Sequence, residues 1–226
     1  MSASSSGRPA KFIASDAPLT ALDVIRDAPV IPVITLDDPG IAVDLAHALV
    51  AGGIRMLEVT LRTAAALACV RRIALGCPEA VVGAGTVCTA RDVAAAVDAG
   101  ARFAVSPGYT PALGGACRAH ALPLLPGAVT PSEIMAALED GFGELKFFPA
   151  LQSGGAAMLR ALAGPFPHVR FCPTGGITAA NASEFLLLPN VACVGGSWLV
   201  PADAVGLRDF GRIESLARSA AALVRN

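Results

Sequence analysis

The feature of this sequence that most restricts its fold is a unit that recurs along almost the whole chain. Each unit consists of a short apolar run, a turn rich in glycine, proline and threonine, and then an alanine-rich stretch with helical spacing. Short strands that alternate with helices are typical of an α/β fold with parallel strands. Eight apolar runs are present, over residues 30–36, 56–60, 80–83, 103–106, 122–125, 145–148, 170–173 and 191–195.

Eight such units predict a (β/α)8 TIM barrel with a short N-terminal helix over residues 18–27. We expect one barrel domain over residues 18–226, and a flexible tail over the small, polar residues 1–17. An open doubly wound sheet is the alternative. It is less favoured because glycine-rich segments follow several strands instead of marking one dinucleotide-binding turn. Helical stretches include residues 41–50, 64–75, 91–99, 131–140 and 213–224, and C-cap glycines are expected at Gly52, Gly53, Gly76, Gly100 and Gly141.

Composition limits the partners and the compartment. The net charge of -1 gives no electrostatic case for nucleic acid or for an anionic membrane surface. No apolar run reaches the roughly 18 residues of a membrane span, and residues 1–9 lack the apolar core of a signal peptide. The six cysteines show no Cys-x-x-Cys spacing, which favours small buried hydrophobes in a reducing cytosol over disulfides or a zinc site. We therefore expect a cytoplasmic protein with no nucleic-acid partner and no membrane association.

Metal chemistry is not expected in the barrel interior. Such a site would need His, Asp or Glu clusters at strand ends. His47 and His120 fall in helical patterns and His168 falls in a loop, so no histidine has a second ligand near a predicted interior position.

The clearest chemical signal is one lysine inside an apolar run. The chain has only Lys11 and Lys146, whereas the other fifteen of its seventeen basic residues are arginine. Lysine can act as an amine nucleophile once burial disfavours its ammonium form, and arginine cannot. Lys146 therefore fits either a Schiff-base lysine or a lysine that snorkels from a strand edge.

Strand alternation places a carboxylate near this lysine. Successive side chains of a strand point to opposite faces, so Lys146 and Phe148 share one face and Leu145 and Phe147 share the other. In the run over residues 56–60, Glu58 lies on the face opposite the apolar pair Leu57 and Val59. Glu58 and Lys146 are thus both predicted to point into the barrel. Glu58 could be a structural partner or a general acid/base, and these roles overlap.

Small and polar residues follow several of the expected strands, at the end of a barrel where active sites lie. Arg62, just past the second strand, can hold a carboxylate, although a surface arginine fits equally well. The turns Ser106-Pro107-Gly108 and Pro126-Gly127 can simply be tight turns, and Trp198 is more in keeping with packing than with stacking on a ligand. The glycine pairs Gly175-Gly176 and Gly195-Gly196, the latter followed by Ser197, stand after the seventh and eighth strands, where barrels often bind phosphate.

Together these segments resemble the 2-keto-3-deoxy-6-phosphogluconate (KDPG) aldolase family, whose members also act as 4-hydroxy-2-oxoglutarate (KHG) aldolases. The segments that carry the resemblance are Leu57-Glu58-Val59-Thr60-Leu61-Arg62-Thr63, Val82-Gly83-Ala84-Gly85-Thr86-Val87, Ser106-Pro107-Gly108, Lys146-Phe147-Phe148-Pro149-Ala150, Pro173-Thr174-Gly175-Gly176-Ile177 and Gly195-Gly196-Ser197-Trp198.

The resemblance implies a homotrimer of barrels that needs neither a metal nor an organic cofactor. It implies Lys146 as the Schiff-base lysine and Glu58 as the general acid/base. Arg62 and Thr86 match residues that hold the pyruvyl carboxylate, and Pro107 and Phe148 match the pocket walls. Thr174 matches the position that governs stereoselectivity, and Gly175, Gly176, Gly196 and Ser197 match the phosphate site. Some members carry arginine late in the first strand, where this chain has Thr35.

The activity that the resemblance implies is cleavage of KDPG to pyruvate and glyceraldehyde 3-phosphate in the Entner–Doudoroff pathway, with KHG as a second substrate that gives pyruvate and glyoxylate. Three alternatives stay open. One is the galactonate-type aldolase with the opposite C4 configuration, although Thr174 favours the gluconate type. Another is a phosphate-binding barrel isomerase or epimerase, which would not use a buried lysine. The third is a non-catalytic sugar-phosphate sensor, for which the cost of burying Lys146 and Glu58 would have no explanation.

Overall fold

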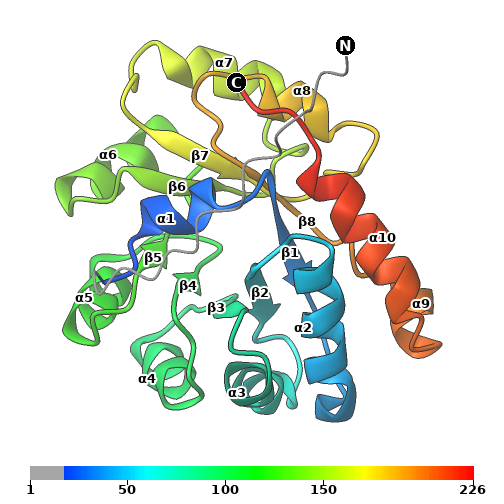
Figure 1. Cartoon of the computed structure of the whole chain (residues 1–226). Helices are drawn as coiled ribbons and strands as arrows, with labels where there is room; N and C mark the ends of the chain where they lie inside the picture. Colours follow the sequence, from blue (N-terminus) through cyan, green and yellow to red (C-terminus); the bar gives the residue numbers. More distant parts are fainter. Residues whose placement is uncertain (1–17) are drawn as a thin grey trace, which may run out of the picture.

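The computed structural model describes residues 18–226, so the expected flexible tail over residues 1–17, including Lys11, lies outside the described residues. Short parallel strands alternate with helices along the described chain (Figure 1). The strands are β1 (Val30–Ile34), β2 (Met56–Thr60), β3 (Val81–Gly85), β4 (Ala104–Val105), β5 (Leu124–Leu125), β6 (Glu144–Phe147), β7 (Arg170–Pro173) and β8 (Val194–Gly196). The helices are α1 (Ala21–Arg26), a 3-10 turn η1 (Pro39–Ile41), α2 (Ala42–Ala51), α3 (Ala66–Gly76), α4 (Ala90–Asp98), α5 (Pro111–Ala119), α6 (Pro131–Glu139), α7 (Gly155–Ala163), α8 (Ala182–Leu186), α9 (Ala202–Gly206) and α10 (Phe210–Ala221).

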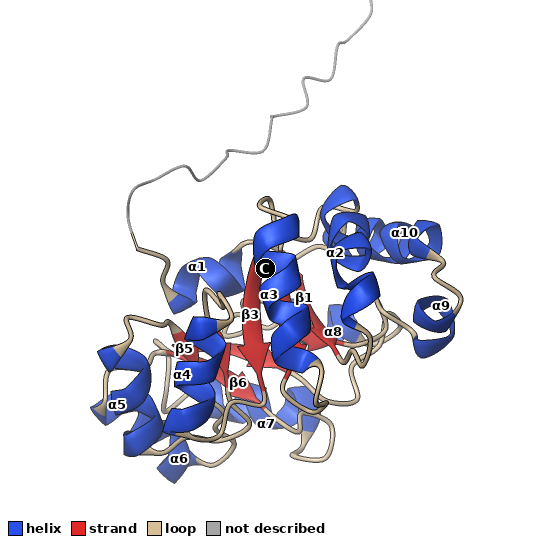
Figure 2. Ribbon diagram, turned by 90° about the horizontal axis from the view of Figure 1, so that it is seen from below, coloured by secondary structure: helices blue, strands red, loops and turns tan. Residues whose placement is uncertain are grey.

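The strands form a curled six-stranded parallel sheet and a two-stranded parallel sheet. The larger sheet has the order β5-β4-β3-β2-β1-β8, and the smaller one pairs β6 with β7. Single parallel bridges connect the two, from Gly127 to Lys146 on one side and from Thr174 to Gly195 on the other. The strands lie in the middle of the molecule and most helices surround them (Figure 2).

Two apolar clusters lie on the two faces of the strands. The larger one fills the space between strands and helices and includes Leu57, Val59, Leu145 and Phe147, as strand alternation predicts. The smaller one occupies the inner face of the curled sheet, where Ile31, Met56 and Leu125 meet Val24 and Ile25 of α1. Helix α1 therefore packs its buried residues into the interior at the N-terminal end of the strands.

Threonines fix where several helices begin. Thr20, Thr89 and Thr130 each accept a hydrogen bond from a backbone N–H three residues later, and an acidic side chain at that later position bonds back to the threonine N–H. This capping box satisfies two donors that a helix start would otherwise leave unpaired. The capped helices α4 and α6 each follow a strand end of the larger sheet, so the caps help to define the loops at the C-terminal ends of the strands.

The structure corrects one of the expected C-caps. Gly53, Gly100 and Gly141 have positive φ, as C-terminal glycines often do, whereas Gly76 is the last residue of α3 and lacks positive φ. Its role is space, because a Cβ on Gly76 would lie 2.8 Å from Val43 Cγ2 in α2. Among residues 18–226, no helix has the length and apolar character needed to cross a membrane.

Candidate active site

Lys146 and Glu58 meet on the inner face of the strands. Nζ of Lys146 donates to Oε1 of Glu58 at 3.1 Å, and the two side chains are only 4% and 3% exposed. The two residues come from β6 and β2, which belong to different sheets, so the contact crosses the interior. Removing one partner of such a buried pair costs about 3–5 kcal/mol, because the remaining charge loses its compensation. Burying two charges is unfavourable in itself, and this cost points to a chemical role for the pair.

Glycines on β3 leave room for the carboxylate. Gly83 and Gly85 are two residues apart and therefore face the same side of the strand. A Cβ on Gly83 would lie 2.5 Å from the ring of Phe103, and a Cβ on Gly85 would lie 2.3 Å from Oε1 of Glu58. The two glycines thus leave space on the inner face of β3 for one aromatic ring and one carboxylate. The close backbone approach that these glycines permit is thus to a side chain of the protein itself, Glu58.

Lys146 lies beside Phe148 and beside the neighbouring strand β7. Its Nζ lies 5.3 Å from the centre of the Phe148 ring, within the range of a cation–π contact. Thr174, at the end of β7, is buried and donates from Oγ1 to the carbonyl of Cys172 at 3.4 Å. A Cβ on Gly195 would lie 2.2 Å from that Oγ1, so the glycine of β8 provides the space for Thr174.

Arg62 and Thr86 lie together at the C-terminal ends of β2 and β3. Nε of Arg62 donates to Oγ1 of Thr86 at 3.0 Å, and Thr86 has a left-handed backbone with φ of 59°. A non-glycine residue in this region is uncommon and marks a constrained loop. The guanidinium carries further N–H donors on its two Nη atoms, and these can take a carboxylate in a fork. The structure therefore brings Arg62 and Thr86 together, and their binding of a carboxylate stays a prediction.

A hydroxyl relay at the end of β1 was not foreseen. Thr60 Oγ1 donates to the carbonyl of Ile34 at 3.0 Å and lies 2.9 Å from Oγ1 of Thr35. Because a hydroxyl has one proton, Thr35 must be the donor within this pair. The exposed Thr35 oxygen then offers lone pairs, which suit a substrate hydroxyl better than an oxyanion. The relay depends on the register of β1 against β2, for which a single sequence carries no signal.

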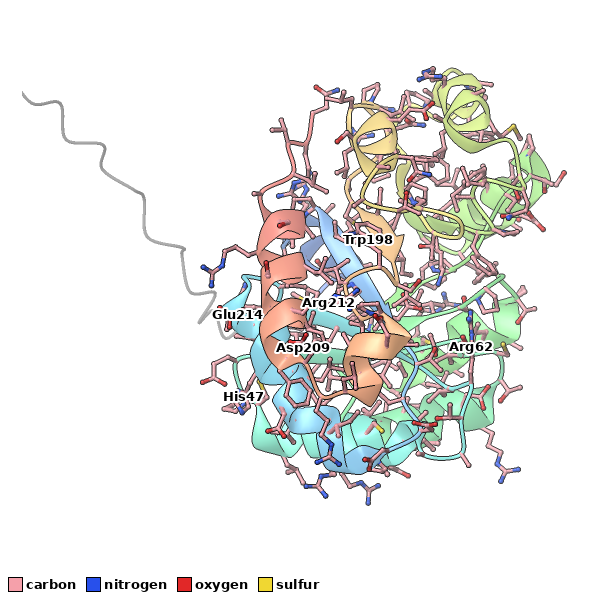
Figure 3. All side chains as sticks on the ribbon, turned by 90° about the vertical axis from the view of Figure 1, so that its right-hand side faces the viewer. His47, Arg62, Trp198, Asp209, Arg212 and Glu214 are labelled. Atoms are coloured by element: carbon pink, nitrogen blue, oxygen red, sulfur yellow. The ribbon has the colours of Figure 1, made fainter. Side chains whose placement is uncertain are left out.

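The glycine-rich ends of β7 and β8 lie side by side. Thr174 bridges Gly195, and the next residues, Gly175 and Gly176, have φ of 105° and 76°. The exposed hydroxyl of Ser197 follows on the β8 side. Trp198, labelled in Figure 3, packs on Gly196, where a Cβ would lie 1.7 Å from its ring, as expected for a packing residue.

The predicted pocket residue Pro107 lies where two loops touch. A Cβ on Gly127 would lie 2.2 Å from the carbonyl oxygen of Pro107, so this glycine lets the loops after β4 and β5 approach each other. Pro107 itself is half-buried. The turn residues in these two loops therefore have a packing reason, and their contact with a ligand stays a prediction.

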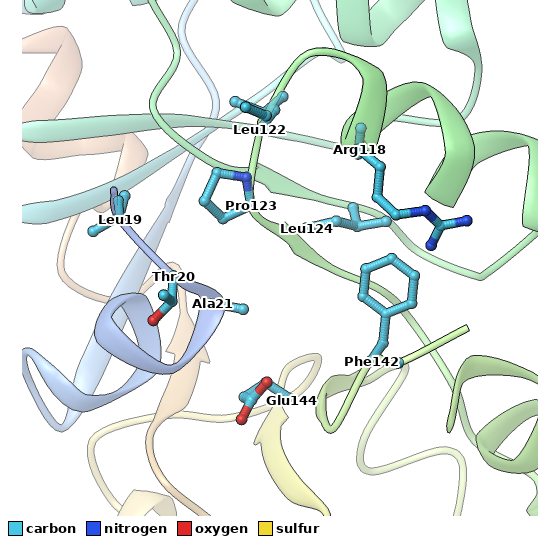
Figure 4. Close-up of a pocket in the computed structure, with 12 residues that line it drawn as sticks. Leu19, Thr20, Ala21, Arg118, Leu122, Pro123, Leu124, Phe142 and Glu144 are labelled. Atoms are coloured by element: carbon cyan, nitrogen blue, oxygen red, sulfur yellow. The ribbon is translucent and has the colours of Figure 1, made fainter. Parts of the chain in front are cut away.

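A separate hollow of about 370 Å³ lies at the other end of the strands. Its lining includes Leu19 and Thr20 beside α1, Pro123 before β5, and Phe142 and Glu144 near the start of β6 (Figure 4). None of the predicted site residues lines it. The predicted site residues lie elsewhere, and this hollow is a surface depression next to the first helix.

Comparison with known proteins gives one consistent family. The family model described as KDPG and KHG aldolase matches residues 22–216. The KHG/KDPG aldolase of Escherichia coli strain K12 is 51% identical over 201 residues, which are 89% of this chain and 94% of that protein.

Two solved structures carry ligands that bear on the site. KDPG aldolase from Legionella pneumophila, with pyruvate captured as a covalent carbinolamine intermediate, superposes with a TM-score of 0.87 at 46% identity, covering 89% of this chain and 98% of that one. The 2-keto-3-deoxy-6-phosphogluconate aldolase of Zymomonas mobilis ZM4 with 3-phosphoglycerate gives 0.86 at 47% identity, covering 91% and 97%.

Proposed function

Since the chain belongs to the KDPG and KHG aldolase family, we propose that it cleaves KDPG to pyruvate and glyceraldehyde 3-phosphate, and KHG to pyruvate and glyoxylate, through a Schiff base at Lys146. It is a class I aldolase. The single observation that carries the assignment of residues is the buried contact of Lys146 with Glu58 at 3.1 Å. This contact joins an amine nucleophile to a group that can accept its proton.

The mechanism follows from these two groups. Glu58 takes a proton from Lys146, and the neutral amine attacks the C2 carbonyl of the keto acid. Glu58 returns this proton to the carbinolamine hydroxyl, which leaves as water and gives an iminium that serves as the electron sink. Glu58, acting through a water, removes the C4 hydroxyl proton, and the C3–C4 bond breaks with its electrons passing to the iminium. The aldehyde leaves, Glu58 returns a proton to C3 of the enamine, and hydrolysis frees pyruvate and Lys146.

The surrounding residues hold the substrate at both ends. Arg62 and Thr86 bind the pyruvyl carboxylate, while Pro107 and Phe148 line the pocket around the three-carbon unit. Thr174 faces the C4 carbinol. This placement is supported by the pairing of Lys146 with Cys172 on adjacent strands, because Thr174 lies two residues after Cys172. The phosphate binds at Gly175, Gly176, Gly196 and Ser197, a site supported by the positive φ of the first two.

The assembly around the site is also part of the proposal. The strands close into a (β/α)8 barrel within a single domain over residues 18–226, supported by the bridges from Gly127 to Lys146 and from Thr174 to Gly195. The enzyme works in the cytoplasm as a homotrimer, and its six free cysteines fit a reducing compartment.

Reductive trapping tests the function. Borohydride added to the protein with pyruvate should attach one reduced pyruvyl group per chain, and peptide mass analysis should place it on Lys146. Lys146→Arg keeps the charge but removes the nucleophile, so it should abolish trapping and aldol cleavage while the protein still folds. An adduct on Lys11, or an active arginine variant, would overturn the Schiff-base assignment and favour a phosphate-binding isomerase.

A further inference from the structure

Three side chains of the types that bind metals lie close together on the outer, helical layer of the molecule. His47 lies in α2, Cys77 directly follows α3, and Glu79 lies in the turn that leads to β3. Sγ of Cys77 is 3.5 Å from Nδ1 of His47 and 3.9 Å from Oε2 of Glu79, and the three ligand atoms lie within 4.8 Å of one another. His47 and Glu79 are exposed and Cys77 is fully buried, so the cluster opens to solvent on one side.

Backbone packing, more than side-chain flexibility, brings this cluster together. Val43 and His47 are four residues apart and therefore share one face of α2. Gly76 sits against Val43 so closely that a Cβ there would lie 2.8 Å from Cγ2, and Cys77 is the next residue. The backbone on both sides of the thiol is fixed as well, since Cys77 N–H donates to Ile73 and Ala80 N–H donates to the Cys77 carbonyl. The positions of the imidazole and the thiol are thus set by the contact between helices.

The distances suit a small tetrahedral ion. Typical Zn–S and Zn–N bonds of about 2.3 and 2.0–2.1 Å, at a tetrahedral angle, put sulfur and nitrogen about 3.5 Å apart. The Cys77–His47 separation of 3.5 Å matches that edge, and the Cys77–Glu79 separation of 3.9 Å exceeds it by a few tenths of an ångström. A thiol–imidazole hydrogen bond alone would explain the first distance, but it would not require the carboxylate.

We propose that His47, Cys77 and Glu79 bind a zinc-class divalent ion with three protein ligands and one water. Thiolate, imidazole and carboxylate are the ligand types that zinc takes in proteins. The site lies away from the aldolase residues, as His47 and Arg62 stand on opposite sides of the molecule in Figure 3. A bound ion would tie α2 to the turn between α3 and β3. The proposal does not depend on the aldolase assignment.

Cobalt provides a spectroscopic test on the full chain. After treatment with a chelator, titration with Co²⁺ should saturate at one equivalent, with a thiolate-to-cobalt charge-transfer band and visible bands of tetrahedral intensity. Zn²⁺ should then displace the cobalt and abolish both. Cys77→Ser should remove the charge-transfer band. Cys88→Ser is the matched control, because Cys88 is the exposed cysteine of the described chain and lies outside the cluster.

Thermal unfolding gives a second readout that survives a folding defect of the cysteine variant. Zinc at about a hundred times its Kd should raise Tm by about 5–10 °C in the wild type and in Cys88→Ser. His47→Ala and Glu79→Ala change exposed residues and should lose most of this rise. The proposal is wrong if no charge-transfer band appears, if the band depends on Cys88 and not on Cys77, or if zinc stabilises His47→Ala as much as the wild type.

Discussion

Replacing Gly85 by alanine should displace the carboxylate of Glu58, the proposed acid/base, while leaving Glu58 itself unchanged. A Cβ at this position would lie 2.3 Å from Oε1 of Glu58, 2.7 Å from its Cγ and 2.9 Å from its Cδ. Ordinary van der Waals contact begins at 3.4 Å, so Oε1, at 2.3 Å from the added Cβ, would have to shift by about 1.1 Å. The carboxylate is 3% exposed and hydrogen-bonded to Lys146, so it cannot move away without loosening that contact.

Both the rate and the stability should respond. A misplacement of about 1 Å in a catalytic group can cost roughly 10²-fold in rate, which corresponds to about 2.7 kcal/mol. Overpacking a buried site costs about 1–3 kcal/mol of folding free energy. We therefore expect Gly85→Ala to remain folded with a lower Tm, and to lose far more kcat than its loss of stability alone would explain.

Steady-state cleavage, with pyruvate release followed by a coupled dehydrogenase, measures kcat, and thermal unfolding measures Tm. Gly115→Ala in α5 is the matched control, because nothing lies within 4 Å of its added Cβ. That variant should keep kcat and gain about 0.5–1 kcal/mol, as alanine usually does over glycine in a helix. If Gly85→Ala keeps the kcat of the wild type, the glycine does not protect the position of Glu58 and the argument from space fails.

Four further outcomes are expected. Glu58→Gln should slow cleavage by about 10²–10⁴-fold and slow deuterium exchange into the pyruvate methyl group in parallel, whereas exchange at the wild-type rate would reveal another base. Ser197→Asp should raise KM for KDPG through repulsion of the phosphate and leave KHG cleavage unchanged; equal losses on both substrates would contradict the phosphate site. Thr174→Val should lose about 1 kcal/mol of discrimination between C4 epimers when pyruvate condenses with glyceraldehyde 3-phosphate, and an unaltered epimer ratio would count against its role. Backbone N–H donation from Thr130 lowers the pKa of the Glu133 carboxyl in the capping box. The contribution of Glu133 to stability is therefore present above its unfolded pKa and is lost as pH falls through the lower folded pKa. Glu133→Gln should flatten the acid side of the stability curve measured by urea unfolding, and an unchanged slope would exclude this contribution.

The sequence allowed the faces of the strands to be predicted because a strand has a period of two. Lys146 and Glu58 were expected on the inner face, and the structure confirms that they meet there. The expected run over residues 122–125 shortens to the two residues Leu124–Leu125, because strand ends depend on which backbone groups find partners across the sheet.

Contacts between neighbouring strands could not be predicted in the same way. Gly85 was expected just past the third strand and Gly195 at the end of the eighth, but each one makes room for a side chain on or just past an adjacent strand, Glu58 and Thr174. The alignment of Thr35 with Thr60, and of His47 with Cys77, also depends on how separate elements pack. These contacts depend on how the strands and helices align in the folded protein, and local sequence propensity does not encode that alignment.

Val24 and Ile25 of α1, which fill the interior at the N-terminal end of the strands, have a kinetic consequence. With that end occupied, substrate, water and both products pass the C-terminal ends of the strands. In the proposed mechanism the aldehyde must depart first, because pyruvate is then still bonded to Lys146. Release is thus ordered, so pyruvate should inhibit competitively with the keto acid and the aldehyde should inhibit noncompetitively.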